Sequence, residues 1–217
     1  TDLDGTLLCS DTNISKENLD AIKRLYKKGI KIAVLTGRTF YEIPYELRSC
    51  GYIDYFVYSN GAGIDNLKYE TVYCEPIEKD TAKAIYNILN SYETFIEIYA
   101  NKTPFVDKRK FSDEHFNYYK IDRDFIPEMY KSRKAISNLS EIMDSDLYNI
   151  EMFDVFFRNN DERESCYNRI CHEFVNVEIT SSMSNNLEIM RKGINKGTGL
   201  QRLCKTARYH PDDVIVI

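Results

Sequence analysis

The sequence has no long apolar run, no concentration of positive charge and no low-complexity tract. A membrane-spanning helix needs about 20 mostly apolar residues in succession, and no stretch of this chain approaches that length. The formal net charge is −5, with 29 basic and 34 acidic residues interspersed along the chain. Nucleic-acid-binding proteins usually carry a basic stripe, so we do not expect a nucleic acid as partner. Because the chain has no long apolar run, we do not expect a membrane as partner either.

The six cysteines lack the paired spacing of a metal site, because none belongs to a CxxC pair. The nearest two, Cys166 and Cys171, have no second pair beside them, so a zinc site is the less favoured interpretation. Reduced thiols in the core are the favoured one. They predict a cytoplasmic location.

The first part of the chain alternates between helix and strand patterns. The composition, 43% apolar and 29% charged, is that of a globular protein with a sizeable core. A helix is expected after Ser15 and should end at Gly29, followed by a strand at 30–35. A second helix should begin beyond Thr39, and a second strand lies at 55–58. This order predicts an α/β fold in which a parallel sheet carries helices on both faces.

The middle of the chain has a different pattern, with hairpins and intervening helices. The expected elements are a hairpin of residues 95–99 and 103–106, a strand at 148–157, a helix at 161–174, and strands at 175–180 and 187–190. This pattern predicts an α+β module inserted into the parallel-sheet core. We place the module at 81–184, between core parts at 1–80 and 185–217.

Asp2 and Asp4 are the first candidates for catalysis, within the segment DLDGTL. Side chains two residues apart at the end of a strand project to the same side, so the two carboxylates can converge. One can act as nucleophile while the other acts as general acid and then base. The alternatives are a polar turn, which stays open, and a calcium loop of the EF-hand type. The calcium loop is excluded because Leu7 and Asn13 stand where it needs Gly and Glu.

Two further segments carry groups suited to binding phosphate. Thr36 and Gly37 follow an apolar strand and precede a helix, where a hydroxyl and free backbone N–H groups can cradle an anion. Lys196 begins a helix, a position unfavourable for a cation unless an anion lies nearby. A capped turn and a solvated lysine are the alternative interpretations of these two segments.

The three segments in this order resemble the motifs of the haloacid dehalogenase (HAD) superfamily. Within it, the segment SNGA at 59–62 and the stretch LEIM…KGINKG at 187–197 resemble the Cof-like phosphatases. The resemblance implies a Rossmann-like HAD core with a large inserted cap domain. It covers essentially the whole chain.

The resemblance also implies roles for individual residues. Asp2 would be the nucleophile and a ligand of Mg²⁺, and Asp4 would be the general acid/base and would give the metal its backbone carbonyl. The Leu3 N–H, Thr36, Gly37 and Lys196 would bind phosphate. Arg38 and Asn60 would lie on the side of the site that faces the cap and could contact the substrate.

The sequence is interpreted as a piece of a longer protein. The family's last acidic motif, which supplies a further metal-binding carboxylate, is expected after a strand at 214–217 and therefore beyond Ile217. Asp212 and Asp213 precede that strand and cannot replace it. We therefore expect residues 1–217 alone to bind Mg²⁺ poorly and to lack activity.

The predicted function is hydrolysis of a small-molecule phosphate monoester, a sugar phosphate or phosphorylated cofactor, through a phospho-aspartate. The alternatives are a phosphomutase or phosphotransferase of the same fold and a non-catalytic phosphometabolite-binding protein. Intact Asp2 and Asp4 speak against the non-catalytic protein, since a binding protein needs no nucleophile. The sequence indicates neither the particular ester nor the oligomeric state.

Overall fold

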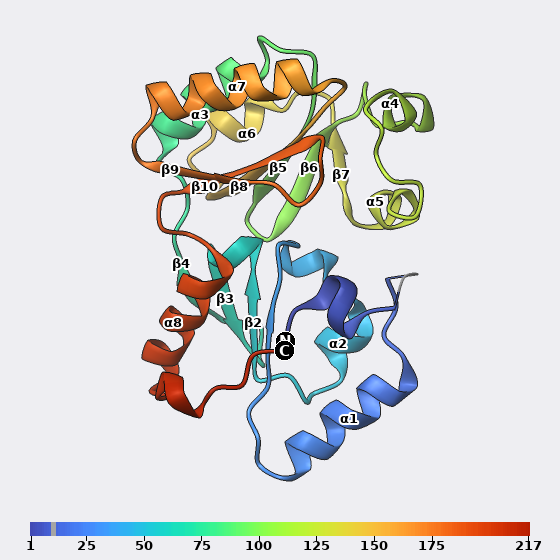
Figure 1. Ribbon diagram of the computed structural model, residues 1–217, viewed down its shortest axis with the longest axis vertical. Coiled ribbons are helices and arrows are strands. Elements are labelled where there is room, and N and C mark those ends of the chain that lie inside the picture. Colours follow the sequence, from blue (N-terminus) through green and yellow to red (C-terminus); the bar gives the residue numbers. More distant parts are fainter. Residues whose placement is uncertain (10–11) are drawn as a thin grey trace. The chain divides into compact units, whose positions relative to one another are not determined.

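The chain forms two units, the second inserted into the first. The computed structural model describes residues 1–9 and 12–217 (Figure 1). The core unit consists of Thr1–Cys74 and Ile194–Ile217, and the inserted unit is Glu75–Gly193. The chain therefore passes from one unit to the other twice.

The boundaries of the inserted unit differ from the expected 81–184. Strand β10 (Asn186–Arg191), which those boundaries assign to the core, pairs antiparallel with β8 (Ile150–Phe157) and with β9 (Val177–Thr180). It is therefore part of the sheet of the inserted unit. An apolar strand has the same sequence pattern in either sheet, so its pairing partners cannot be predicted from that pattern.

The core unit is built on a mixed sheet with strand order β1-β2-β3-β4. β1 (Ala33–Leu35) runs parallel to β2 (Tyr55–Tyr58), as predicted, although β1 is shorter than expected. β3 (Gly63–Asn66) and β4 (Thr71–Cys74) extend the sheet as an antiparallel hairpin. This hairpin was not predicted. β4 is largely exposed and lacks the apolar pattern of a buried strand.

The first residues of the chain lie beside β1 with parallel-sheet hydrogen bonding. The Thr1 amino group donates to the Ala33 carbonyl at 2.9 Å, and Leu35 N–H donates to the Thr1 carbonyl at 2.9 Å. On the other side, Asp2 N–H donates to the Ile217 carbonyl at 3.1 Å. Residues 214–217 do not form the regular strand that was expected. The backbone of Asp2 is nevertheless held from both sides.

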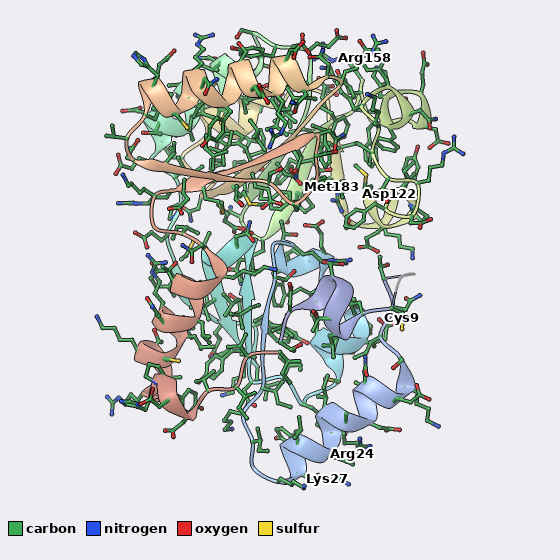
Figure 2. The ribbon with its side chains drawn as sticks, in the orientation of Figure 1. Cys9, Arg24, Lys27, Asp122, Arg158 and Met183 are labelled. Atoms are coloured by element: carbon green, nitrogen blue, oxygen red, sulfur yellow. The ribbon has the colours of Figure 1, made fainter. Side chains whose placement is uncertain are left out.

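Helices and tight turns connect the strands of the core unit. They are η1 (Leu3–Leu7), α1 (Lys16–Lys27), η2 (Phe40–Glu42), α2 (Tyr45–Ser49), η3 (Ser59–Gly61), α8 (Lys196–Ala207) and η4 (Pro211–Asp213). Ser15 caps α1 as predicted, because its hydroxyl accepts a hydrogen bond from Asn18 N–H. Ile22 on this helix is buried, whereas Arg24 and Lys27 in its later turns are exposed (Figure 2).

The inserted unit is a six-stranded sheet with order β7-β6-β5-β8-β10-β9. Its remaining strands are β5 (Thr94–Ala100), β6 (Thr103–Asp107) and β7 (Lys134–Ile136). Its helices are α3 (Lys79–Leu89), α4 (Asp113–Tyr118), α5 (Ile126–Ser132), α6 (Ser140–Asp144) and α7 (Asn160–Glu173). In Figure 1, α3, α6 and α7 lie together over one face of the sheet. The predicted hairpin is confirmed, and Asn101 and Lys102 at its turn both have positive φ.

Three acidic side chains form a row across the sheet of the inserted unit. Glu97 on β5 lies opposite Asp154 on β8, and Asp154 lies opposite Glu188 on β10. All three are buried. Arg133, also buried, pairs with Glu97 at 3.1 Å, and Asn186 Nδ2 donates to Asp154 Oδ1 at 2.9 Å. Burial and the carboxylates of Glu188 and Glu97 raise the pKa of Asp154 well above its ordinary value.

The six cysteines are thiols and form no disulfides, but only part of the prediction of core thiols is correct. Cys166 and Cys204 are buried, and burial raises the pKa of the Cys166 thiol to about 12. Cys9, Cys74 and Cys171 are exposed, because they lie on solvent-facing positions of a turn, an outer strand and a helix. Within the described ranges, no helix combines the length and apolarity needed to cross a membrane.

Candidate active site

Asp2 lies where the segment beside β1 leaves the sheet and winds into η1. Its carboxylate accepts a hydrogen bond from Leu3 N–H at 2.7 Å through Oδ1. Leu3 is fully buried and anchors the turn. Gly5 follows with φ of +71°, a conformation that favours glycine, and this residue lets the chain turn away from the sheet. The Asp2 side chain is 35% exposed, so its carboxylate is accessible to a ligand.

Lys196 lies against Asp2 although the two residues are 194 positions apart. Its Nζ donates to Asp2 Oδ2 at 2.7 Å. Lys196 is the first residue of α8, whose preceding residue Asn195 accepts from Thr198 N–H and so fixes the start of the helix. The Asp2 carboxylate is thus an anion beside the lysine at this helix start.

Asp4 is held by Arg38 through two hydrogen bonds. Arg38 Nε donates to Asp4 Oδ2 at 2.9 Å, and Arg38 Nη2 donates to Asp4 Oδ1 at 2.7 Å. The Arg38 side chain is only 5% exposed, whereas that of Asp4 is 47% exposed. Arg38 therefore contacts the catalytic candidate Asp4, and its expected contact with a substrate stays a prediction. The motif shows that an arginine follows Gly37 but not which way its long side chain turns.

Thr36 and Gly37 follow β1, Asn60 follows β2, and the two loops meet where these strands end. Thr36 N–H donates to the Val57 carbonyl at 2.9 Å, and Asn60 N–H donates to the Thr36 carbonyl at 3.0 Å. A Cβ atom on Gly37 would lie 3.1 Å from Asn60 Oδ1, so the Asn60 side chain packs closely against this glycine. Thr36 and Asn60 are both buried, and the structure brings these two predicted site residues together.

The turn η3 packs against the helix that carries Lys196. Ser59 and Asn60 both have positive φ, and Gly61 has φ of +100°. A Cβ atom on Gly61 would lie 2.7 Å from the Asn195 carbonyl, so only glycine fits between η3 and α8. Gly199 on α8 contacts Gly61, since a Cβ atom on Gly199 would lie 2.9 Å from the Gly61 Cα. This close approach positions the start of α8 relative to the loop of Thr36.

Glu42, Gly61 and Gly199 support the site and were missed by the sequence analysis. Glu42 Oε2 accepts a hydrogen bond from Thr39 N–H at 2.8 Å, and the Glu42 carbonyl accepts from Arg38 Nη1 at 3.0 Å. An acidic residue three positions after Thr39 is a helix-start signal that could have predicted the first of these bonds. The sequence contains no comparable signal for the contact between the two glycines.

The oxygen atoms of this site suit a hard divalent cation. Asp2 offers a partly exposed carboxylate, and a carboxylate that accepts one hydrogen bond at each oxygen still has lone pairs available. Asp4 has its side chain held by Arg38, and its backbone carbonyl is a further oxygen ligand for a metal. Across residues 1–9 and 12–217, no three His, Cys, Asp or Glu side chains gather as metal ligands. A carboxylate and a carbonyl oxygen are ligands of the kind that Mg²⁺ takes, together with water and phosphate oxygens.

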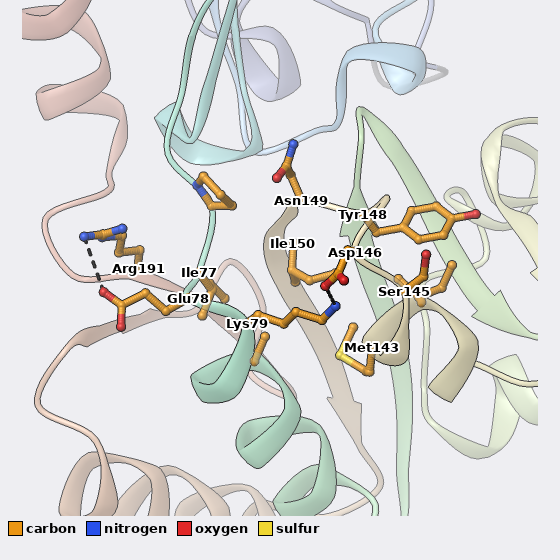
Figure 3. A pocket seen from close by; sticks show the side chains of 13 residues that line it. Ile77, Glu78, Lys79, Met143, Ser145, Asp146, Tyr148, Asn149, Ile150 and Arg191 are labelled. Atoms are coloured by element: carbon orange, nitrogen blue, oxygen red, sulfur yellow. Dashed lines mark hydrogen bonds and ion pairs between the residues drawn. The ribbon is translucent and has the colours of Figure 1, made fainter.

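A cavity of about 250 Å³ lies within the inserted unit, apart from these residues (Figure 3). Its lining includes Ile77, Tyr148, Lys79 and Arg191, and none of the predicted site residues. Lys79 pairs with Asp146, and Arg191 lies 3.6 Å from a Glu78 carboxylate oxygen. The cations of this cavity are thus paired with carboxylates.

A family model matches the chain along its whole length and shows the family to which the chain belongs. The model of the haloacid dehalogenase-like hydrolase family matches residues 1–217. The chain belongs to this hydrolase family. The resemblance inferred from the three motifs is therefore confirmed, and so are the α/β fold class and the prediction of a hydrolytic enzyme.

Several relatives of this hydrolase are named phosphatases. Phosphatase YwpJ of Bacillus subtilis is 26% identical over 94% of the chain and 76% of its own length. The 5-amino-6-(5-phospho-D-ribitylamino)uracil phosphatase YcsE of the same organism is 23% identical over 100% of the chain and 74% of its own length. Among solved structures, a HAD subclass IIB sugar phosphatase matches with a TM-score of 0.74 and 20% identity, covering 96% of this hydrolase and 75% of that chain. That likeness shows the shared fold.

Proposed function

We propose that this hydrolase cleaves a small-molecule phosphate monoester through a phospho-aspartate formed on Asp2. The observation that supports this most strongly is the contact of Lys196 Nζ with Asp2 Oδ2 at 2.7 Å. A lysine fixed beside a reactive carboxylate lies where it can bind the phosphoryl group that the carboxylate attacks. Asp4, on the same turn, supplies the second carboxylate that the reaction needs.

Phosphate binding falls to Lys196 and to the loop of Thr36 and Gly37 in this proposal. The Thr36 hydroxyl and the backbone N–H groups beside it donate hydrogen bonds to the phosphoryl oxygens. Leu3 N–H, which donates to Asp2 Oδ1 in the structure, donates to a phosphoryl oxygen when substrate is bound. The charge-assisted contact from Lys196 strengthens as negative charge builds up on the oxygens.

The reaction then proceeds in two steps on this chain's own residues. In the first step, an Asp2 carboxylate oxygen attacks phosphorus in line, the P–O bond to the alcohol breaks, and Asp4 gives its proton to the departing alcohol oxygen. In the second, Asp4 takes a proton from a water molecule, which attacks phosphorus and releases inorganic phosphate. Asp2 is regenerated as a carboxylate, and Asp4 holds a proton again.

Mg²⁺ is the cofactor in this proposal. The Asp2 carboxylate and the Asp4 backbone carbonyl are the groups that would hold it. When bound, the cation would screen the repulsion between Asp2 and the phosphate oxygens. Lys196 remains responsible for holding the phosphoryl group against Asp2.

The proposed substrates are sugar phosphates and phosphorylated cofactors or their precursors. Two similar proteins support this substrate class, because one is named a phosphoribitylamino-uracil phosphatase and the other a sugar phosphatase. We assign the choice among esters to the inserted unit, because the groups around Asp2 contact only the phosphoryl end of a substrate. The unit acts as the cap domain in this proposal.

A screen of phosphate esters with the full-length protein and Mg²⁺ tests this function, with released inorganic phosphate as the measurement. We expect turnover of at least one sugar phosphate or phosphorylated cofactor, and none with Asp2→Asn. Transfer of the phosphoryl group to a second sugar without phosphate release would instead indicate a phosphomutase or phosphotransferase. Tight binding of an ester without turnover would indicate a binding protein.

A further inference from the structure

Each nitrogen atom of the Arg38 guanidinium group donates a hydrogen bond to a residue of the core unit. Two of its nitrogen atoms donate to the two carboxylate oxygens of Asp4, at 2.9 and 2.7 Å. The third, Nη1, donates to the Glu42 carbonyl at 3.0 Å. An arginine fork that binds both oxygens of a carboxylate fixes the plane of that carboxylate as well as its position.

The backbone of Arg38 is anchored as firmly as its side chain. Arg38 N–H donates to Thr36 Oγ1 at 3.1 Å, and the Arg38 carbonyl accepts from Ser59 N–H at 2.8 Å. The side chain is 5% exposed. Glu42, whose carbonyl holds Nη1, is itself held, since its carboxylate accepts from Thr39 N–H at 2.8 Å. Arg38 is therefore fixed independently of Asp4.

Asp4 lacks this support from its own surroundings. It lies in a turn next to Gly5, its backbone is extended rather than helical, and its side chain is 47% exposed. An exposed aspartate in a turn samples several rotamers unless a partner selects one. The fixed guanidinium of Arg38 is the partner that selects the orientation of Asp4.

We propose that Arg38 is a positioning residue that orients Asp4 for proton transfer, and not a residue that binds the substrate phosphate. The inference rests on the proposed function, in which Asp4 transfers the proton. A carboxylate held by two N–H donors keeps a further lone pair on each oxygen, so Asp4 can still exchange a proton with the leaving group. Arg38 acts only through Asp4. Its loss should affect only steps that require a proton from Asp4 or transfer one to it.

The consequence differs between esters. The leaving group of an alkyl phosphate departs as an alkoxide unless its oxygen is protonated. The leaving group of 4-nitrophenyl phosphate departs as a stable phenolate and needs no proton. In Arg38→Met, first-turnover release of alcohol from an alkyl phosphate such as glucose 6-phosphate should fall by roughly 10- to 100-fold, because small misplacements of a catalytic group have effects of this size. First-turnover release of nitrophenolate should change much less. Arg38→Lys, which retains the charge but not the fork, should give an intermediate loss.

Binding of inorganic phosphate separates positioning from substrate binding. Calorimetric titration of Arg38→Met with phosphate in the presence of Mg²⁺ should give nearly the wild-type affinity. A loss of phosphate affinity as large as that of Lys196→Ala would overturn the proposal, because Arg38 would then be a phosphate ligand. Arg48→Met is the matched control, since Arg48 is partly buried and, like Arg38, donates to a backbone carbonyl, that of Ile43.

A double-mutant cycle tests whether Arg38 acts through Asp4. In an Asp4→Asn background, Arg38→Met should cause no further loss of first-turnover rate on the alkyl ester, since coupled residues are not additive. Additive losses would overturn the proposal. Turnover retained by Asp2→Asn would contradict the proposed chemistry itself, and this outcome is distinct from additivity. Circular dichroism and the Tm of each variant identify unfolding. If Arg38→Met does not fold, Arg38→Lys replaces it in the double-mutant cycle.

Discussion

Lys196 Nζ lies 2.7 Å from Asp2 Oδ2, so the first turn of α8 and the segment beside β1 meet at one carboxylate. Neither side chain is deeply buried, with 41% of Lys196 and 35% of Asp2 exposed. An ion pair this exposed contributes little to stability on average. The role of this ion pair is therefore better explained by its position, because the pair places a cation beside the proposed nucleophile.

Replacing Asp2 by Asn should abolish turnover while leaving the fold intact. Asn is nearly isosteric with Asp and can still accept the hydrogen bond from Leu3 N–H, but it lacks the anionic oxygen that attacks phosphorus. Phosphate release and circular dichroism of the full-length variant check this expectation. Wild-type turnover in a folded Asp2→Asn protein would show that no phospho-aspartate is formed at this position.

Replacing Lys196 by Ala should reduce catalytic efficiency by roughly 10- to 100-fold, since a charge-assisted contact to phosphate contributes about 1.5–3 kcal/mol. The thermal stability should change little, because the ion pair with Asp2 is exposed. Lys205→Ala on the same helix and Lys192→Ala are matched controls, as both side chains are exposed. Equal losses of kcat/KM in all three variants would mean that only the overall charge matters.

The buried acidic row of the inserted unit should make stability depend on pH. Asp154 has a raised pKa in the folded state, against an ordinary value of about 3.9 in the unfolded chain. The folded state therefore binds the Asp154 proton more tightly than the unfolded chain does. The contribution of this proton to the free energy of unfolding is fully present below about pH 4. It is lost as pH rises through the folded-state pKa of Asp154.

Asp154→Asn tests this dependence. Asn is uncharged and can still accept from Asn186 Nδ2, so the variant should match or exceed the wild-type stability at high pH and lose most of the pH dependence. Asp146→Asn is the control with the opposite sign, because Lys79 lowers the pKa of the exposed Asp146. Urea unfolding between pH 2 and pH 9 measures both. An unchanged pH profile in Asp154→Asn would assign the dependence to another group.

Exchanging the inserted unit for that of a related phosphatase should change which esters are hydrolysed while preserving dependence on Asp2. The junctions should be placed at Cys74/Glu75 and Gly193/Ile194, where the chain passes between the units. An exchange at 81 and 184 would separate β10 from β8 and β9 and should give an unfolded protein. The same ester preference after a folded exchange at the first pair of junctions would show that the core unit selects the substrate.

Local patterns in the sequence were sufficient to predict many elements. Ser15 caps α1, the Asn101–Lys102 turn joins β5 and β6, and α8 begins at Lys196, all as predicted. These features depend on residues within a few positions of one another, where capping and turn preferences act directly. The hairpin of β3 and β4 escaped prediction because the outer strand is exposed and has no apolar periodicity.

The sequence by itself determined the family and indicated a second α+β region inserted into the core, and the catalytic residues that it indicates stay predictions. Tertiary structure decided which of these residues touch. The motif places Arg38 two residues after Thr36, but only the fold turns its guanidinium toward Asp4, 34 positions away. Likewise, only strand pairing assigns β10 to the inserted unit. The physical reason is that a side chain's direction and a strand's partner depend on packing against distant residues, which no local pattern specifies.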